Sequence, residues 1–204
     1  MCTGHLRIGP RLSAALALTV AGCAPSAFVN PEYGRLEPVR VAVAPVANES
    51  IHQLDSVTFG GLLQRTLTGG TTYNVPEIMK EALMDALFSR GYDPVDFKHD
   101  LGRPEPDFRR PLDPAAERPP FDAYLVCTIE EWQSDKISSS SMHMRYRIEM
   151  FKVPTGEVLF SGRFSCGYRD ELGEYRFEEV ASRIRGSVKR ALSALPEAGD
   201  RSRG

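Results

Sequence analysis

The run from Met142 to Val153 alternates apolar and polar side chains over nearly its whole length. Such alternation is the period of a strand with one buried face, because successive side chains of a strand point to opposite sides. Residues 154–157 read Pro-Thr-Gly-Glu, a turn sequence, and residues 158–168 again have the composition of a strand. The two segments are therefore predicted to form an antiparallel hairpin. Its core face would contain Met142, Met144, Tyr146, Ile148 and Met150, and its other face His143, Arg145, Arg147 and Glu149.

Three more segments have the composition of strands. Residues 39–46 are rich in β-branched side chains, and residues 92–97 form a short second candidate. Residues 122–132 are an almost continuous apolar run, which is typical of a central strand buried on both faces. Together with the hairpin, these segments predict a sheet of about five strands.

Two segments carry apolar side chains at helical spacing. The first begins at Pro76, which suits the first turn of a helix, and ends before Gly91. The second covers residues 177–195. A run from Val57 is either irregular or helical, because glycine pairs interrupt it. The predicted fold is α/β: a single domain in which two main helices pack on a mixed sheet of about five strands.

The first 22 residues are predicted to be a signal peptide. Arg7 and Arg11 precede a short apolar run from Leu12 to Val20. As a helix, this run would span about 14 Å, which is about half the thickness of a hydrocarbon core. It is therefore typical of a signal sequence and too short for a membrane span.

The residues Val20, Ala21, Gly22 and Cys23 resemble the lipobox of bacterial lipoproteins. Small side chains suit cleavage of an extended backbone, and the cysteine thiol accepts a diacylglycerol as a thioether. We expect a covalent lipid on Cys23, no other cofactor, and attachment to a membrane. Ala24 stands where an aspartate would retain a lipoprotein of enteric bacteria in the inner membrane. By that resemblance, the periplasmic face of the outer membrane is favoured, with the inner membrane as the alternative.

The mature chain is expected to have three parts. Residues 23–38 would be a lipid-anchored linker, residues 39–195 the periplasmic α/β domain, and residues 196–204 a disordered tail. The linker is rich in proline and shows no periodicity, so residues 24–38 would reach about 50 Å when extended. Residues 99–121 contain six prolines and few large apolar side chains. They are expected to form a loop that does not join a core.

Cys127 and Cys166 remain in the domain after removal of the signal peptide and lipidation of Cys23. An oxidising compartment would allow them to form a disulfide if their strands were neighbours with facing Cβ atoms. Alternatively, both are small apolar side chains of the core. Their spacing matches no metal-binding or redox motif, so thiol chemistry is not expected.

Other candidate sites are better explained as ordinary structure. His143 lies between Met142 and Met144, which are ligands that copper accepts, but alternation places the histidine on the opposite face. Glu130 and Glu131 are adjacent acids, and adjacent strand residues face opposite ways, so a solvated strand end is expected. The sequence contains no nucleophile elbow and no phosphate-binding glycine motif. No catalytic residue, no metal site and no enzymatic activity are predicted.

Charge argues against nucleic acid as a partner. The first 22 residues carry Arg7 and Arg11 and no acid, so the mature chain has 23 basic and 27 acidic side chains and a net charge of −4. Binding of DNA or RNA would need a basic face or stripe.

Taken together, these segments resemble the CsgG and TolB amino-terminal-like periplasmic lipoproteins, which include PelC-like proteins and lipoproteins of a domain of unknown function. The resemblance rests on the lipobox, a short linker, the strand Val-Ala-Val-Ala-Pro-Val-Ala-Asn-Glu-Ser (41–50) and a helix ending in Arg90-Gly91-Tyr92. It also includes the strand 123–126 and the hairpin turn Thr155-Gly156-Glu157. The long amphipathic membrane hairpins of the curli pore have no obvious equivalent in this chain.

The resemblance implies a docking or ring-forming module without enzymatic activity. Such a module would be an accessory or assembly component of a cell-envelope secretion, polysaccharide-export or peptidoglycan-related system. Its partners would be the membrane, envelope proteins and other copies of the same chain. Two alternatives stay open: an auxiliary lipoprotein of an ABC-type lipid-transport system, and a ligand-binding lipoprotein with a concave pocket.

Overall fold

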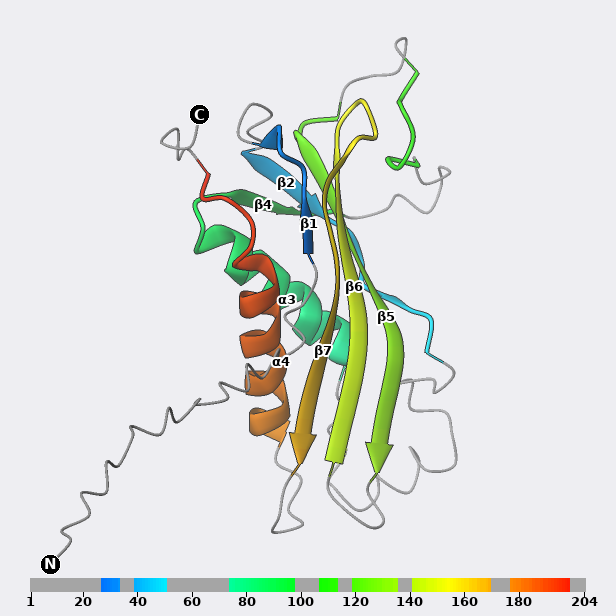
Figure 1. Cartoon of the computed structure of the whole chain (residues 1–204), viewed down its shortest axis with the longest axis vertical. Helices are drawn as coiled ribbons and strands as arrows, with labels where there is room; N and C mark the ends of the chain where they lie inside the picture. Colours follow the sequence, from blue (N-terminus) through cyan, green and yellow to red (C-terminus); the bar gives the residue numbers. More distant parts are fainter. Residues whose placement is uncertain are drawn as a thin grey trace, which may run out of the picture.

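The computed structural model describes residues 27–33, 39–50, 74–97, 107–113, 119–135, 141–169 and 177–198. These residues form one seven-stranded mixed sheet with two helices, α3 and α4, packed on one face (Figure 1). The predicted fold class is therefore confirmed. The candidate helix from Val57 lies outside the described residues. Among the helices that are described, none is long and apolar enough to cross a membrane.

The order of strands across the sheet is β1-β7-β6-β5-β2-β4, and the short β3 pairs with β5. The pairs β1/β7, β7/β6 and β6/β5 are antiparallel, while β2 is parallel to both β5 and β4. The predicted hairpin is confirmed as β6 and β7. The strands are β1 (Ala27–Val29), β2 (Arg40–Val43), β3 (Ala47–Asn48), β4 (Asp93–Asp96), β5 (Ala123–Asp135), β6 (Ser141–Lys152) and β7 (Val158–Arg169).

The helices begin and end close to where the sequence predicts. In α3 (Val75–Phe88), the side chain of Asn74 caps the first turn by accepting a hydrogen bond from the Glu77 amide at 3.3 Å. Gly91 follows with φ +85°, a conformation that favours glycine and ends the helical run. The second helix, α4 (Phe177–Leu192), ends three residues before the predicted limit, but Leu195 is still buried.

The main core lies between the helices and the sheet. α4 packs over β7, and α3 packs beside α4 near β2 and β4. Met144, Tyr146, Ile148 and Met150 of β6 are fully buried, as the alternating pattern predicts. Burial of each such side chain stabilises the fold by about 1.5–3 kcal/mol, so this layer fixes which face of the hairpin remains outside the core.

The folded domain extends beyond its expected boundaries at both ends. Residues 27–29, which lie in the expected linker, form β1 at the edge of the sheet beside β7. Tyr33 is buried, and its hydroxyl lies 2.9 Å from that of Tyr92. At the other end, the Pro196 carbonyl accepts a hydrogen bond from Tyr92 at 2.7 Å. Residues 27–33 and 196–198 are therefore part of the fold.

Part of the proline-rich segment 99–121 joins a second, smaller core, contrary to expectation. Phe108 is buried with Tyr124 at a ring-centroid distance of 4.5 Å, and Phe97 and Phe121 pack around this pair. Proline interrupts regular structure, but it does not prevent aromatic side chains between the prolines from being buried. This aromatic cluster covers one end of the sheet on the face opposite the helices.

Candidate functional site

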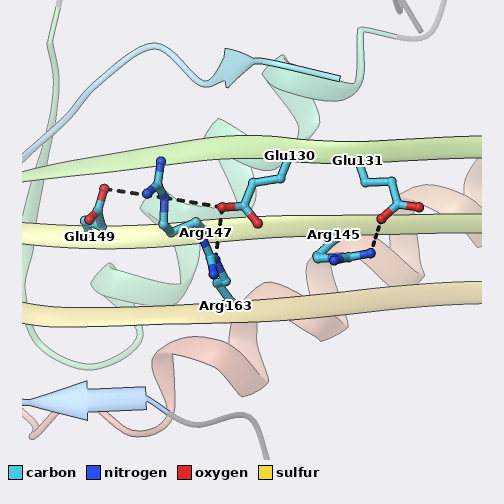
Figure 2. Close-up of polar contacts among 6 residues, drawn as sticks. All are labelled: Glu130, Glu131, Arg145, Arg147, Glu149 and Arg163. Carbon is cyan, nitrogen blue, oxygen red and sulfur yellow. Dashed lines mark hydrogen bonds and ion pairs between the residues drawn. The ribbon is translucent and has the colours of Figure 1, made fainter. Parts of the chain in front are cut away.

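A group of charged side chains occupies the remainder of the face opposite the helices. On β6, Arg145, Arg147 and Glu149 alternate with the fully buried core residues and therefore point away from the helices. Glu130 and Glu131 of β5 and Arg163 of β7 lie beside them in space (Figure 2). We call these residues the charged face: Glu130, Glu131, Arg145, Arg147, Glu149 and Arg163.

The expectation that Glu130 and Glu131 face opposite ways is wrong. Ile129 pairs with Tyr146 and Glu131 pairs with Arg145, so Glu130 is an extra residue at an irregularity of the ladder. An extra residue of this kind is a β-bulge, which breaks the alternation locally. As a result both glutamates contact arginines of the charged face, as Figure 2 shows.

Ion pairs connect the three strands across the charged face. The Glu130 Oε1 atom accepts a hydrogen bond from Arg163 Nε at 3.1 Å and lies 3.5 Å from Arg147 Nε. Arg147 Nε also lies 3.6 Å from a carboxylate oxygen of Glu149. Arg145 pairs separately with Glu131. Three positive and three negative side chains therefore balance one another on this surface.

The centre of the charged face is partly buried and its border is open to solvent. The side chains of Glu130, Arg147 and Glu149 are 20%, 29% and 22% exposed, whereas those of Arg145 and Arg163 are 52% and 68% exposed. The Arg147 Nε atom is buried without a hydrogen-bond partner, because its two carboxylate neighbours are too distant or badly angled.

Ion pairs at a surface contribute little to folding stability. Exposed pairs are worth about 0.2–1 kcal/mol each, and cross-strand pairs of opposite charge are similar. Across an interface, the same groups fix orientation and partner choice. The partly buried centre of the charged face joins the three strands, while the arginines at its open border are suited to recognition.

A shallow pocket lies between the charged face and the aromatic cluster. Its lining is Ala44, Pro45, Ala47, Asp107, Phe108, Arg109, Tyr124 and Val126. Asp107 is already engaged, since it pairs with Arg110 at 3.3 Å and accepts a hydrogen bond from the Arg109 amide at 3.2 Å. The pocket therefore has few polar groups directed at a ligand, in contrast with a typical small-molecule site.

The structure decides between the two alternatives for the cysteines. Cys127 on β5 lies opposite Ile148, and Cys166 on β7 lies opposite Met144, so β6 separates them. Two strand spacings are about 10 Å, while a disulfide needs Cα atoms about 5.5 Å apart. Both thiols are free and buried, and burial raises the pKa of each. They are core side chains, and the disulfide alternative is wrong.

The remaining predicted sites fall into two groups. Val20, Ala21, Gly22 and Cys23 of the lipobox lie outside the described residues. His143 is exposed and Met144 is buried, on opposite faces of β6, as predicted. Among the side chains that the structure describes, no group of three or more His, Cys, Asp or Glu could hold a metal ion.

The described residues define an α/β domain in which a mixed sheet is covered by two helices on one face. The chain is similar to PelC from Paraburkholderia phytofirmans, solved as a dodecamer, with a TM-score of 0.52 and 13% identity over 85% of this chain and 98% of that chain. A second structure of that PelC, from a variant, gives a TM-score of 0.49 at 14% identity, covering 78% and 90% of the two chains.

The lipoprotein GNA1162 from Neisseria meningitidis is also similar, with a TM-score of 0.41 and 17% identity over 77% of this chain and all of the other. No protein-family model matches the chain, and no curated protein matches it. The likeness to the PelC structure with a TM-score of 0.52 shows the fold. The predicted resemblance to PelC-like proteins is confirmed at that level.

Proposed function

We propose that this protein is an outer-membrane lipoprotein, anchored at the periplasmic face through lipid on Cys23, that acts as a docking and ring-forming component of a cell-envelope assembly. It works without enzymatic chemistry, in a secretion, polysaccharide-export or peptidoglycan-related system. The charged face carries the proposal, because Arg145 and Arg163 at its border are exposed and suited to fixing the orientation of a neighbour.

The PelC fold supports the oligomeric part of this proposal. The PelC structure with this fold was solved as a dodecamer. A ring requires two different surfaces of one subunit to complement each other, so that each copy joins the next head to tail. The charged face offers cations at its border, where Arg145 and Arg163 are the side chains most open to a neighbouring subunit.

The position of β1 supports a domain held close to the bilayer. Only three residues, 24–26, separate Cys23 from the first residue of β1. The Cα atoms of Cys23 and Ala27 can therefore be at most about 14 Å apart. The sheet edge formed by β1 and β7 would lie near the lipid headgroups, and the long linker expected from the sequence would not be available.

Anchoring is tested by intact mass and sucrose-gradient fractionation of the protein from native membranes. The Cys23→Ala variant is expected to lose the acyl mass and to leave the membrane fraction. Cys2→Ala is the matched control, because Cys2 lies in the predicted signal peptide and its loss should change neither result. An unmodified wild-type mass, or a Cys23→Ala variant that stays with the membrane, would contradict the proposed anchor.

Docking through the charged face is tested by crosslinking in intact membranes. The wild type is expected to give a defined ladder of crosslinked copies, and Arg145→Glu is expected to shorten it. Lys189→Glu makes the same change of charge at an exposed position of α4 and should leave the ladder intact. An unchanged ladder of crosslinked copies in Arg145→Glu would show that the charged face is not a contact surface of the assembly.

A further inference from the structure

The outer edge of β7 is only partly paired. β1 pairs with Phe160, Ser161 and Gly162, while β7 continues to Arg169. Beyond Gly162, none of the strands that the structure describes pairs with this edge. An unpaired edge presents a row of backbone N–H and C=O groups that another extended segment can bind.

Two hydrogen bonds identify which backbone groups of β7 point outward. The Leu159 carbonyl accepts from the Asn30 amide of the β1 segment at 2.9 Å, and the Ser165 carbonyl accepts from the Ser187 hydroxyl of α4 at 3.3 Å. Both carbonyls therefore point away from β6. Because outward and inward groups alternate along a strand, those of Arg163 and Gly167 also point outward.

The two edges of the sheet differ in how they discourage pairing. At the other edge, β4 reads Asp-Pro-Val-Asp, with a proline that cannot donate and two acids. These are devices that protect an edge strand from added strands. Residues 163–167 of β7 contain no proline and no acid, and Ser165 and Gly167 leave room for a second backbone.

Cations flank the β7 edge on both sides of the sheet. Arg163 is 68% exposed on the charged face. On the helix side, the Ser187 hydroxyl of α4 contacts the Ser165 carbonyl, and Arg183 and Arg190 lie about one helical turn on either side of Ser187. Among the described residues, no carboxylate forms an ion pair with Arg190.

We propose that residues 163–167 of β7 bind an extended acidic segment of a partner protein by strand addition. Main-chain hydrogen bonds to the edge would supply affinity. Acidic side chains would compete with Glu130 for Arg163 on one face and meet Arg190 on the other. A second copy of β7 would bring no acidic side chain to these arginines, because residues 163–167 contain none. The inference rests on the proposed docking function and names the chemistry of one partner.

The test uses the purified full chain in detergent and two fluorescent peptides, one alternating threonine and glutamate and the other threonine and lysine. Anisotropy is expected to show binding of the acidic peptide alone. Amide resonances of residues 163, 165 and 167 are expected to shift on titration. The double variant Arg163→Glu/Arg190→Glu should weaken binding about fivefold or more, since two exposed ion pairs are lost.

Ser165→Pro removes an outward N–H without touching the ladder to β6, so it is expected to abolish peptide binding. Lys189→Glu is the control for charge, and thermal unfolding by circular dichroism confirms that each variant is folded. Equal binding of the two peptides, or wild-type affinity in Ser165→Pro, would overturn the proposal. The crosslinked ladder in membranes tests the proposed function separately and does not depend on either peptide.

Discussion

The hydroxyl of Tyr33 lies 2.9 Å from the hydroxyl of Tyr92. Tyr92 in turn donates to the Pro196 carbonyl, so one hydrogen-bonded chain joins the amino-terminal segment, the strand entry after α3 and the carboxy-terminal segment. Such a chain ties both flanks of the domain to its centre. It follows that substitutions within it affect the two ends of the fold together.

Substitutions of the two hydrogen-bonded tyrosines should lower the free energy of unfolding by different amounts. Tyr33→Phe removes one hydrogen bond and is expected to lower the free energy of unfolding by about 1 kcal/mol. Tyr92→Phe leaves the Pro196 carbonyl without this partner and the Tyr33 hydroxyl with only the Met150 sulfur at 3.6 Å, and is expected to cost about 1–3 kcal/mol. Urea unfolding followed by tryptophan fluorescence measures both values. Equal losses of unfolding free energy in the two variants would contradict this account, in which Tyr92 bonds to both Tyr33 and Pro196.

Alkaline pH should destabilise the fold. Burial raises the pKa of Cys127, Tyr33 and Tyr146 above their ordinary values of 9.0 and 10.0. Their neutral forms are favoured in the folded state, so this stability is fully present below about pH 9 and is lost as the pH rises further. The urea midpoint is expected to fall from about pH 9 upward, and less steeply in Tyr146→Phe. A flat profile over this range would contradict the burial of these groups.

The bulge on β5 predicts an unusual tolerance to deletion. Removal of Glu130 would leave Ile129 opposite Tyr146 and Glu131 opposite Arg145, so Trp132 would keep its place in the core. The expected cost is about 1 kcal/mol, from the loss of surface ion pairs. Deletion of Ile148 from the regular part of β6 would turn the following residues to the wrong face and is expected to prevent folding. Circular dichroism and urea unfolding compare the two.

Alanine in place of two different glycines should change the stability of the fold in opposite directions. Gly156 has φ +72°, and a Cβ atom there would lie 2.7 Å from the Arg110 carbonyl carbon, so Gly156→Ala is expected to destabilise the fold by about 1–3 kcal/mol. Gly186 lies inside α4, where a Cβ would meet only the tip of Arg190 at 3.5 Å. Gly186→Ala is expected to stabilise by about 0.5–1 kcal/mol. Thermal unfolding distinguishes the two, and matching signs would contradict this account.

Sequence patterns alone predicted the elements whose buried face or limits are set by residues close together in the sequence. The alternation over residues 142–153 predicted which face of β6 is buried, and Pro76 and Gly91 marked the limits of α3. The charged side of the hairpin followed from the same alternation. In each case the determining interaction is between residues close in sequence or on one face.

The parts that sequence reasoning missed depend on distant partners. β1 has only three residues, and its strand exists through pairing with β7. The bulge that brings Glu130 and Glu131 together is a property of the β5–β6 register, with no local signal in the sequence. Phe108 is buried because it packs on Phe97, which follows β4, and on Tyr124 of β5, which proline content alone does not reveal.

The pairing of β1 with β7 determines how a mechanical load would enter the domain. Any tension transmitted through residues 24–26 acts first on the three-residue ladder between β1 and β7, and then on the segment held by Tyr33. Those few bonds are the weakest point between a tethered end and the rest of the sheet. A protein pulled between a membrane and its neighbours would yield there first, with β5, β6 and β7 still intact.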